Sequence, residues 1–339
     1  MCQPLKLRRK PAAGGAVFVS RRVPDEAIRT LRRAGIRAEV NPRDRVLSPD
    51  ELIRICRGKE GLLCLLSDAI DRSFLDAAPS LRGIALMAVG FNNVDVAAAT
   101  GRGIPVSNTP GVLTDATADL AWALLLAVAR RIPESERFLR RGKFQAWGPM
   151  LFLGGDLRGK TLGIVGAGRI GTAVGLRSRG FGLKVIYTDG KRNRVLEKEL
   201  GARRVSLPVL LKTADYLTLH VPLSPDTRHL IGTRELKRMK KTACLINTSR
   251  GPVVDEAALA RSLQRREIAG AGLDVFENEP RVHPGLLTLE NAVLLPHIGS
   301  ATIETRTKMA VMAAENLVAM MRGKRAPNCI NPEVYTQSA

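Results

Sequence analysis

The sequence predicts an α/β protein whose parallel sheets are covered by helices and divided between two domains. At 339 residues the chain is too long for one ordinary hydrophobic core. Short apolar runs of strand length alternate with segments of helical spacing, which is the pattern of parallel strands joined by helical crossovers. Hydrophobic residues make up 45% of the chain and charged residues 25%, as in soluble globular proteins.

The first part of the chain contains three candidates for buried strands, at residues 16–20, 62–66 and 83–89. Residues 24–35 have helical apolar spacing and end in a glycine, which is a common stop signal. A long helix is predicted over residues 303–322, near the other end of the chain. We expect it to pack on the first domain, which would make that domain discontinuous.

The clearest predicted helix covers residues 115–131, and its middle, residues 120–129, is apolar on every side. A helix of this kind is buried in a large core or at an interface. We therefore expect it to join two domains or two subunits. Its apolar run is well short of the roughly 18 to 20 residues that span a bilayer, so no membrane association is expected.

A second alternating series begins at Lys160. Its strand candidates are residues 161–165, 184–188, 216–220, 243–247, 270–274 and 292–295. Six short apolar runs with helical connections predict a doubly wound, nucleotide-binding sheet.

The chain is strongly basic, with 53 Lys and Arg residues against 32 Asp and Glu residues and a formal net charge of +21. The basic residues form short, dispersed clusters, without a recognisable nucleic-acid-binding module. We therefore expect a solvated basic surface that attracts anionic substrates and cofactors, and no specific nucleic-acid partner. Incidental binding of polyanions stays open.

The five cysteines are far apart and form no Cys-x-x-Cys pair, which is typical of a reduced, cytoplasmic protein without a metal site. Residues 1–15 are basic, contain no acidic residue and lack the apolar stretch of a secretory signal. We interpret them as a disordered tail, with a transit peptide as the alternative.

A glycine-rich turn directly follows the predicted strand 161–165. Its residues are Gly166, Ala167, Gly168, Arg169, Ile170 and Gly171. Such glycines permit a tight turn and close approach of backbone to a pyrophosphate, and the following helix offers free N–H groups to phosphates. The motif alone is a weak signal. Here Asp189 ends the next strand, 18 residues after Gly171, where a carboxylate can bind ribose hydroxyls. The sequence therefore predicts a dinucleotide site.

Three later segments begin at the carboxyl ends of predicted strands, the edge where ligands bind in open α/β sheets. They contain Arg250, Glu279 and His297. Taken singly, each has an ordinary explanation: a surface arginine, a solvated loop acid, and a core histidine held by a carbonyl. Together they supply the groups that a keto-acid reductase needs. One binds a carboxylate, one gives a proton to the ketone oxygen, and one keeps that donor protonated.

These motifs resemble those of the D-isomer-specific 2-hydroxyacid dehydrogenases. The similar segments are residues 166–171, 247–251, 272–280 and 296–302. Residues 108–119 and 147–154 are similar to the glyoxylate and hydroxypyruvate reductases of that family. The resemblance runs from about residue 16 to residue 334. One departure is Phe91-Asn92-Asn93, where the family usually has Tyr-Asp-Asn.

The resemblance implies two Rossmann-like domains, an active-site cleft between them and usually a homodimer. The substrate domain would consist of residues 16–112 and 298–339, and the dinucleotide-binding domain of residues 113–297. Trp147 is expected either to enter the substrate pocket of the neighbouring subunit or to lie in the hinge of its own subunit.

The resemblance also implies a role for each residue of the group. Arg250 would bind the substrate carboxylate and carbonyl oxygen, His297 would be the acid in reduction, and Glu279 would hold His297 protonated. The residues assigned to the substrate, a small 2-keto or 2-hydroxy acid, are Leu66, Val89, Gly90 and Arg250. Those assigned to the cofactor are Gly166, Ala167, Gly168, Arg169, Ile170, Gly171, Asp189, Gly190, Lys191, Val221, Pro222, Thr248, Ser249, Asp274 and Gly299.

Cofactor choice depends on the end of the second nucleotide-domain strand. Asp189 would repel a 2′-phosphate, whereas the basic residues at positions 191, 192 and 194 could neutralise one. We therefore expect NAD(H) to be preferred and NADP(H) to be accepted. Two alternatives stay open. One is another enzyme of the family, of D-lactate, phosphoglycerate or phosphite type, whereas Glu279 argues against formate. The other is a dinucleotide-sensing, corepressor-like binding protein.

Overall fold

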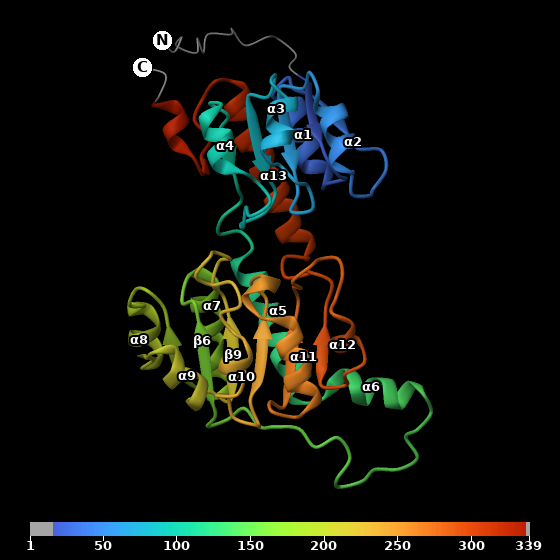
Figure 1. Cartoon of the computed structure of the whole chain (residues 1–339), viewed down its shortest axis with the longest axis vertical. Coiled ribbons are helices and arrows are strands. Elements are labelled where there is room, and N and C mark those ends of the chain that lie inside the picture. Colours follow the sequence, from blue (N-terminus) through green and yellow to red (C-terminus); the bar gives the residue numbers. More distant parts are fainter. Residues whose placement is uncertain (1–15, 337–339) are drawn as a thin grey trace. The chain divides into compact units, whose positions relative to one another are not determined.

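The computed structural model describes residues 16–336, which form two compact units (Figure 1). Unit 1 comprises the described residues up to Leu113 and from Thr302 onwards, and unit 2 is Thr114–Ala301. Each unit has one sheet, and all of the paired strands are parallel. The predicted α/β class with two parallel sheets is therefore confirmed. The predicted basic tail, residues 1–15, lies outside the described residues.

The sheet of unit 1 has the strand order β2-β1-β3-β4-β5, which reverses between β1 and β3. Its strands are β1 (Ala16–Val19), β2 (Arg37–Val40), β3 (Gly61–Cys64), β4 (Gly83–Leu86) and β5 (Val106–Ser107). Every residue of β3 and β4 is buried, as expected for central parallel strands covered on both faces. The point of reversal is where such sheets place their ligands.

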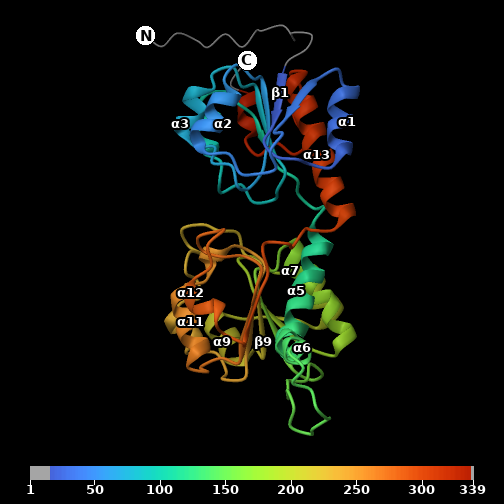
Figure 2. The same ribbon diagram turned by 90° about the vertical axis from the view of Figure 1, so that its right-hand side faces the viewer.

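Helices cover both faces of this sheet (Figure 2). On one face lie α1 (Asp25–Arg33) and α13 (Ile303–Met321), whose apolar side chains share a core with β1. The other face is covered by α2 (Pro49–Cys56), α3 (Arg72–Ala77) and α4 (Val96–Gly101). The last long helix of the chain thus completes the core of the unit that contains the first strand.

Unit 2 has a seven-stranded sheet in the order β12-β11-β10-β9-β6-β7-β8, which reverses between β6 and β9. Its strands are β6 (Thr161–Val165), β7 (Lys184–Thr188), β8 (Arg203–Arg204), β9 (Tyr216–Leu219), β10 (Cys244–Asn247), β11 (Gly270–Leu273) and β12 (Ala292–Leu294). This order is that of a doubly wound dinucleotide-binding sheet with one further strand.

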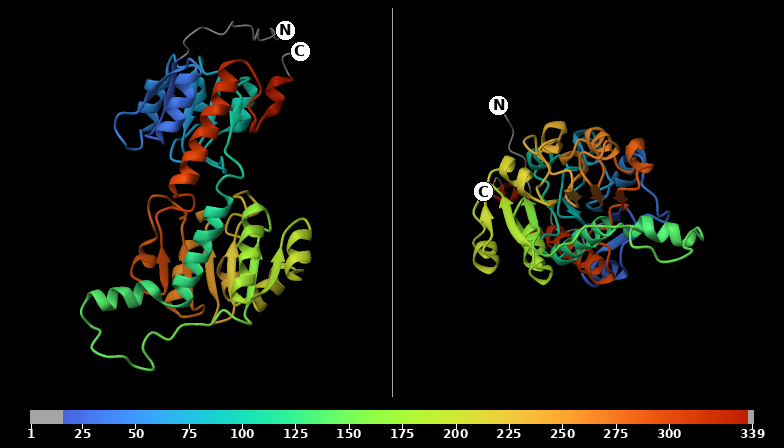
Figure 3. Two further views of the ribbon diagram at one scale, coloured as in Figure 1. Left: turned by 180° about the vertical axis from the view of Figure 1, so that it is seen from behind. Right: turned by 90° about the horizontal axis from the view of Figure 1, so that it is seen from below.

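One face of the unit 2 sheet is covered by α5 (Thr114–Ala129) and α7 (Arg169–Arg177), and Leu196 of a third helix, α8 (Arg194–Leu200), packs into the same core. The opposite face is covered by α9 (Leu207–Thr213), α11 (Glu256–Gln264) and α12 (Pro284–Leu287) (Figure 2). The remaining helices of the unit are α6 (Ile132–Arg140) and α10 (Thr233–Leu236). In Figure 3, α6 and the chain that follows it extend away from the sheet of their own unit.

Several predicted strands end one to three residues earlier than expected, because the apolar residues continue beyond the last ladder hydrogen bonds. Three short strands were missed. Of these, β2 and β8 are edge strands rich in exposed polar residues, and β5 has two residues. The helix predicted to reach Arg131 ends at Ala129, since Arg131 has a left-handed backbone (φ 53°) and precedes α6.

Within the described chain, residues 120–129 are not covered on every side, so the expectation of a subunit interface stays a prediction. Ala123 is exposed, and Leu120 and Ala127 on the same side of α5 are only partly buried. Among residues 16–336, no helix is both long and apolar enough to cross a membrane.

Candidate active site

The glycine turn joins β6 to α7 in a backbone path that side chains would block. Gly166 has a φ of 90°, and a Cβ there would lie 2.7 Å from the carbonyl carbon of His220. A Cβ on Gly171 would overlap the carbonyl oxygen of Gly166. Within the described chain, open space surrounds Gly168, the N-cap of α7, and no side chain caps this helix. The helix N-terminus is therefore free to bind phosphates.

Asp189 ties the glycine turn to the end of β7. Its carboxylate accepts the backbone N–H of Ala167 at 2.7 Å and that of Lys191 at 3.0 Å. Arg204 on β8 donates to the carbonyl oxygens of Asp189 and Gly190, both at 3.0 Å. The carboxylate is only partly buried, so it can also accept from ribose hydroxyls.

The segment after β9 borders the same turn. A Cβ on Gly166 would lie 2.8 Å from the backbone nitrogen of Val221, which Pro222 follows. His220 is held through its Nε2, 2.8 Å from the hydroxyl of Thr218, while its enclosed Nδ1 has no partner among the described residues. Burial lowers the pKa of His220 to about 3, so the ring is neutral.

Arg250 follows β10, in a turn organised by one buried amide. Asn247 accepts from both the backbone and the hydroxyl of Ser249 and donates to the carbonyl oxygen of Arg250 at 2.9 Å. The Arg250 guanidinium donates to the carbonyl oxygen of Ser249 at 2.7 Å. Burial lowers the pKa of Arg250, and the charge of Glu279 opposes that effect. Arginine still stays protonated, so the site holds a fixed positive charge.

Gly251, the residue after Arg250, brings this turn into contact with the loop after β11. A Cβ on Gly251 would overlap the carbonyl group of Phe276, so only glycine fits. The backbone of the Arg250 turn therefore packs directly against the loop that carries Glu279.

Glu279 and His297 form a hydrogen-bonded pair, with Nδ1 of His297 2.8 Å from Oε2 of Glu279. The other carboxylate oxygen accepts the backbone N–H of Phe276 at 3.0 Å. Burial would raise the pKa of Glu279, but the hydrogen bond and charge of His297, together with Phe276 and Arg250, lower it overall. Because Glu279 is ionised and engages Nδ1, the Nε2 of His297 is the ring nitrogen that can serve a substrate.

Buried Asp274 orients the backbone beyond His297. Its two oxygens accept the N–H groups of Ile298 and Gly299, both at 2.7 Å. Burial raises the pKa of Asp274, while these two bonds and the charge of His297 oppose the shift. Directly after neighbouring β10, the buried hydroxyl of Thr248 has no partner in the described chain, so it can bond to a ligand.

Unit 1 holds the other predicted substrate residues, Leu66 after β3 and Val89 and Gly90 after β4. Asn93 donates to the carbonyl oxygens of Leu65 at 3.0 Å and Asp68 at 2.8 Å. The carbonyl oxygen of Val89 accepts from the side-chain amide of Asn108 at 2.7 Å. Side-chain amides therefore fix the backbone of both segments.

Asp68 bridges the point where the strand order of this sheet reverses. One oxygen of its carboxylate accepts two hydrogen bonds. One comes from the hydroxyl of Ser20, which follows β1, and the other from the N–H of Leu65, which follows β3, at 2.8 Å. The residue is 2% exposed. Burial raises the pKa of Asp68, and the bonds from Ser20 and Leu65 oppose it.

The structure brings Arg250, Glu279 and His297 together because β10, β11 and β12 are neighbours in the sheet. Sequence reasoning missed three residues that hold the backbone of the site, which are Asp68, Asn93 and Asn247. A polar residue at the end of an apolar run was the available signal for Asn247. Within residues 16–336, no group of three or more His, Cys, Asp or Glu side chains could hold a metal ion.

A glycine turn at a switch point and a carboxylate at the end of the next strand define a dinucleotide-binding protein. A paired histidine and glutamate beside a partly buried arginine are the groups of an NAD(P)-dependent oxidoreductase. Residues 122–299 match the family described as D-isomer specific 2-hydroxyacid dehydrogenase, NAD binding domain. The chain belongs to the D-isomer-specific 2-hydroxyacid dehydrogenase family.

Three relatives show how far the similarity extends. A glyoxylate reductase of Thermococcus litoralis is 49% identical over 95% of this chain and 98% of that protein. A solved structure from Thermus thermophilus is 46% identical, covers 93% of this chain and 99% of that one, and has a TM-score of 0.88. An NADPH-dependent glyoxylate/hydroxypyruvate reductase of Sinorhizobium meliloti, solved with NADP and malonate, is 34% identical to this chain. The match covers 94% of this chain and 97% of that one, with a TM-score of 0.82.

Proposed function

We propose that this protein reduces glyoxylate and hydroxypyruvate to the corresponding D-2-hydroxy acids, with Arg250, Glu279 and His297 as its catalytic group. The observation that carries the proposal is the 2.8 Å pair between His297 and Glu279 beside the partly buried charge of Arg250. Relatives about half identical over nearly the whole chain are glyoxylate reductases, which supports this substrate class.

Each residue has a defined task in the proposed reaction. Arg250 binds the carboxylate and the ketone oxygen of the substrate through its planar fork of donors. His297 gives the proton of its Nε2 to the ketone oxygen as that oxygen gains negative charge. Glu279 stabilises the protonated ring and fixes its orientation through Nδ1. When bound, the nicotinamide dinucleotide supplies the hydride.

The test is a screen of purified protein against glyoxylate, hydroxypyruvate, pyruvate and 3-phosphohydroxypyruvate, each with NADH and NADPH. We expect the highest kcat/KM with glyoxylate or hydroxypyruvate. A preference for pyruvate or the phosphorylated acid would assign the chain to another branch of the family. Cofactor binding without turnover of any keto acid would favour a dinucleotide-sensing protein.

Within this proposal, unit 1 is the substrate domain and unit 2 the dinucleotide-binding domain. The match of residues 122–299 to an NAD binding domain supports the assignment of unit 2. Leu66, Val89 and Gly90 would then contact the substrate from unit 1. The residues proposed to contact the cofactor are Gly166, Ala167, Gly168, Arg169, Ile170, Gly171, Asp189, Gly190, Lys191, Val221, Pro222, Thr248, Ser249, Asp274 and Gly299.

The proposed cofactor is NAD(H), with NADP(H) accepted less efficiently. The carboxylate of Asp189 would meet a 2′-phosphate as a like charge, at a cost of about 1 to 4 kcal/mol depending on the effective dielectric. Exposed Lys191 can offset part of that cost. We expect kcat/KM to be about tenfold higher with NADH than with NADPH, and Asp189→Ser to reduce the ratio. Asp156→Ser removes the same charge at an exposed position as the control. A wild type that prefers NADPH would refute this assignment.

A homodimer is also proposed, because two apolar surfaces of unit 2 lack a cover within the described chain. One is the α5 stripe formed by Leu120, Ala123 and Ala127. The other lies in the segment after α6, where Trp147 is 80% exposed and Met150 76% exposed. A second copy of the chain would bury both. Light scattering should give twice the 36.8 kDa mass of one chain, and a monomer mass would rule the dimer out.

We further propose a cytoplasmic location. The four cysteines among the described residues are all free, as is typical of reducing compartments. Cell fractionation with an antibody against the chain checks this assignment.

A further inference from the structure

The loop that carries Glu279 is anchored at both ends by one buried carboxylate. Glu256, the first residue of α11, is 5% exposed. Its Oε1 accepts the backbone N–H of Glu277, and its Oε2 accepts that of His283 at 3.0 Å. The two anchored nitrogens lie on either side of Glu279, so one side chain sets the width of the loop.

A second glutamate, Glu277, accepts a backbone hydrogen bond from Glu256 in turn. Oε2 of Glu277 faces the backbone N–H of Glu256 at 3.4 Å, so the two residues exchange backbone donors. Oε1 of Glu277 lies 2.5 Å from Nε2 of His229, and Arg228 approaches it at 3.5 Å. The start of α11 and the guanidinium of Arg228 place positive charge beside these carboxylates.

His229 connects this loop to the Arg250 turn. Its backbone N–H donates to the carbonyl oxygen of Pro252 at 2.7 Å, while its ring holds Glu277. Pro252 is two residues beyond Arg250, and Glu277 is two residues before Glu279. One residue therefore bonds to both of the segments that carry Arg250 and Glu279.

Packing alone does not fix this loop. A pocket of about 720 Å³ lies beside it and is lined by residues 277–284 with Glu256 and Ala257. One side of the loop thus lacks close-packed neighbours, so the hydrogen bonds at its ends contribute to its placement together with the packing of Gly251 and Val282.

We propose that Glu256, Glu277 and His229 are positioning residues that set the placement of Glu279 and His297 against Arg250. This inference rests on the proposed function. None of the three enters the proposed proton transfer. A misplacement of about 1 Å in a catalytic group can lower a rate by about 100-fold, so loosening the loop should lower kcat and leave the glycine turn and Asp189, which follow β6 and β7, unchanged.

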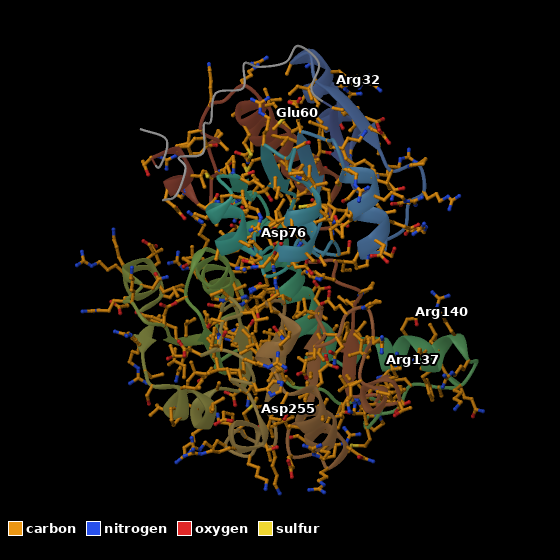
Figure 4. The ribbon with its side chains drawn as sticks, turned by 45° about the horizontal axis from the view of Figure 1, so that its top comes forward. Arg32, Glu60, Asp76, Arg137, Arg140 and Asp255 are labelled. Carbon is orange, nitrogen blue, oxygen red and sulfur yellow. The ribbon has the colours of Figure 1, made fainter. Side chains whose placement is uncertain are left out.

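The main variant is Glu256→Gln, which keeps the size of the side chain but turns one acceptor into a donor that faces a backbone N–H. The matched control is Asp255→Ala at the start of the same helix, labelled in Figure 4. Asp255 caps α11 by accepting the N–H of Ala258 and has no hydrogen bond to the 277–283 loop in the described chain. Both variants weaken α11, but only Glu256→Gln releases the loop.

The readouts are kcat for glyoxylate, the dissociation constant of NADH from fluorescence, and Tm. We expect Glu256→Gln to lower kcat by about 10- to 100-fold with the NADH constant within about twofold. Asp255→Ala should lower Tm and keep kcat. Equal losses of kcat in the two variants, or unchanged kcat in Glu256→Gln, would overturn the inference.

His229, whose side chain is 40% exposed, provides a second pair of variants that should fold even if Glu256→Gln does not. His229→Ala removes the donor to Glu277, and His229→Gln restores an N–H at a similar reach. We expect a fall in kcat in the first and recovery in the second, whereas equal kcat values in both would count against a positioning role. If wild type itself fails to reduce glyoxylate, the proposed function fails. If wild type is active and these variants match it, only this inference fails.

Discussion

The carboxyl edges of the two sheets present different chemistry. In unit 2 the edge presents charged side chains, namely Arg250, Glu279 and His297, each beyond the end of its own strand. In unit 1 the edge presents backbone, and its polar side chains point inward to hold that backbone, as Asp68 and Asn93 do. In the proposed function, the first edge would carry out proton transfer, whereas the second would bind and orient the substrate.

This difference determines what a mutation can show. Replacing a side chain on the unit 2 edge removes a reacting group directly. On the unit 1 edge the proposed contacts include the backbone of Val89 and Gly90, which replacing a side chain leaves in place. These contacts can be tested by changing the side chains that hold the backbone.

The largest effect is expected from His297→Ala, which removes the proposed acid. A general acid contributes about 10²- to 10⁴-fold, so kcat for glyoxylate should fall by that range. NADH binding, measured by fluorescence, should stay close to wild type. Retention of most of the rate would mean that the reacting side chain on this edge is another residue.

The next effect concerns Arg250→Lys, which keeps the charge but loses the planar fork. We expect kcat/KM for glyoxylate to fall on the order of 100-fold, because the substrate would lose its orientation. Arg265→Lys, just after α11 on the same unit, is the control and should behave as wild type. Normal kinetics in Arg250→Lys would place this residue outside the site.

A smaller effect is expected on the unit 1 edge, from Asp68→Asn. The amide oxygen can still accept from Ser20 and Leu65, but these become bonds to a neutral group. Such bonds contribute about 0.5 to 1.5 kcal/mol, against about 1.5 to 3 kcal/mol for bonds to a charged group. We expect KM for glyoxylate to rise about tenfold with little change in the dissociation constant of NADH. Asp76→Asn, at an exposed site (Figure 4), is the control. An unchanged KM would remove the backbone of unit 1 from substrate binding.

The smallest effect is on stability and concerns His220. Its pKa is about 3 in the folded chain and 6.5 as the ordinary value, so between these values the unfolded chain binds more protons. Stability is therefore lost as pH falls below 6.5. From pH 6.5 to 5.5 we expect a loss of about 1 kcal/mol in urea unfolding, and His220→Gln should lack this increment. Equal pH slopes in the two proteins would show that the ring is not kept neutral.

The sequence predicted those parts of the molecule in which the apolar periodicity and the chemistry of the residues indicate the same structure. The turn at Gly166 and the strands on either side of it follow from periodicity and glycine chemistry, and Thr161–Val165 was correct at both ends. The edge strands β2 and β8 were missed, because their polar, exposed residues carry no apolar signal.

The candidate site shows the same division. Arg250, Glu279 and His297 lie in recognisable motifs at strand ends, so the sequence alone could indicate them as candidate catalytic residues. Glu256 could not be found, because a glutamate in the first turn of a helix is ordinary. Its two bonds to the Glu279 loop depend on tertiary contacts 21 and 27 residues away in sequence.

The position of α13 at the far end of the chain has a consequence for synthesis. Unit 2 is one continuous stretch, so it can fold as soon as it leaves the ribosome. Before α13 is made, α1 is the only helix among the described residues that packs on the face of β1, β3 and β4 that α13 covers. That apolar face stays open while the whole of unit 2, from Thr114 to Ala301, is translated. A nascent chain stalled before Ile303 would therefore expose a surface that chaperones bind, whereas one released after Met321 would not.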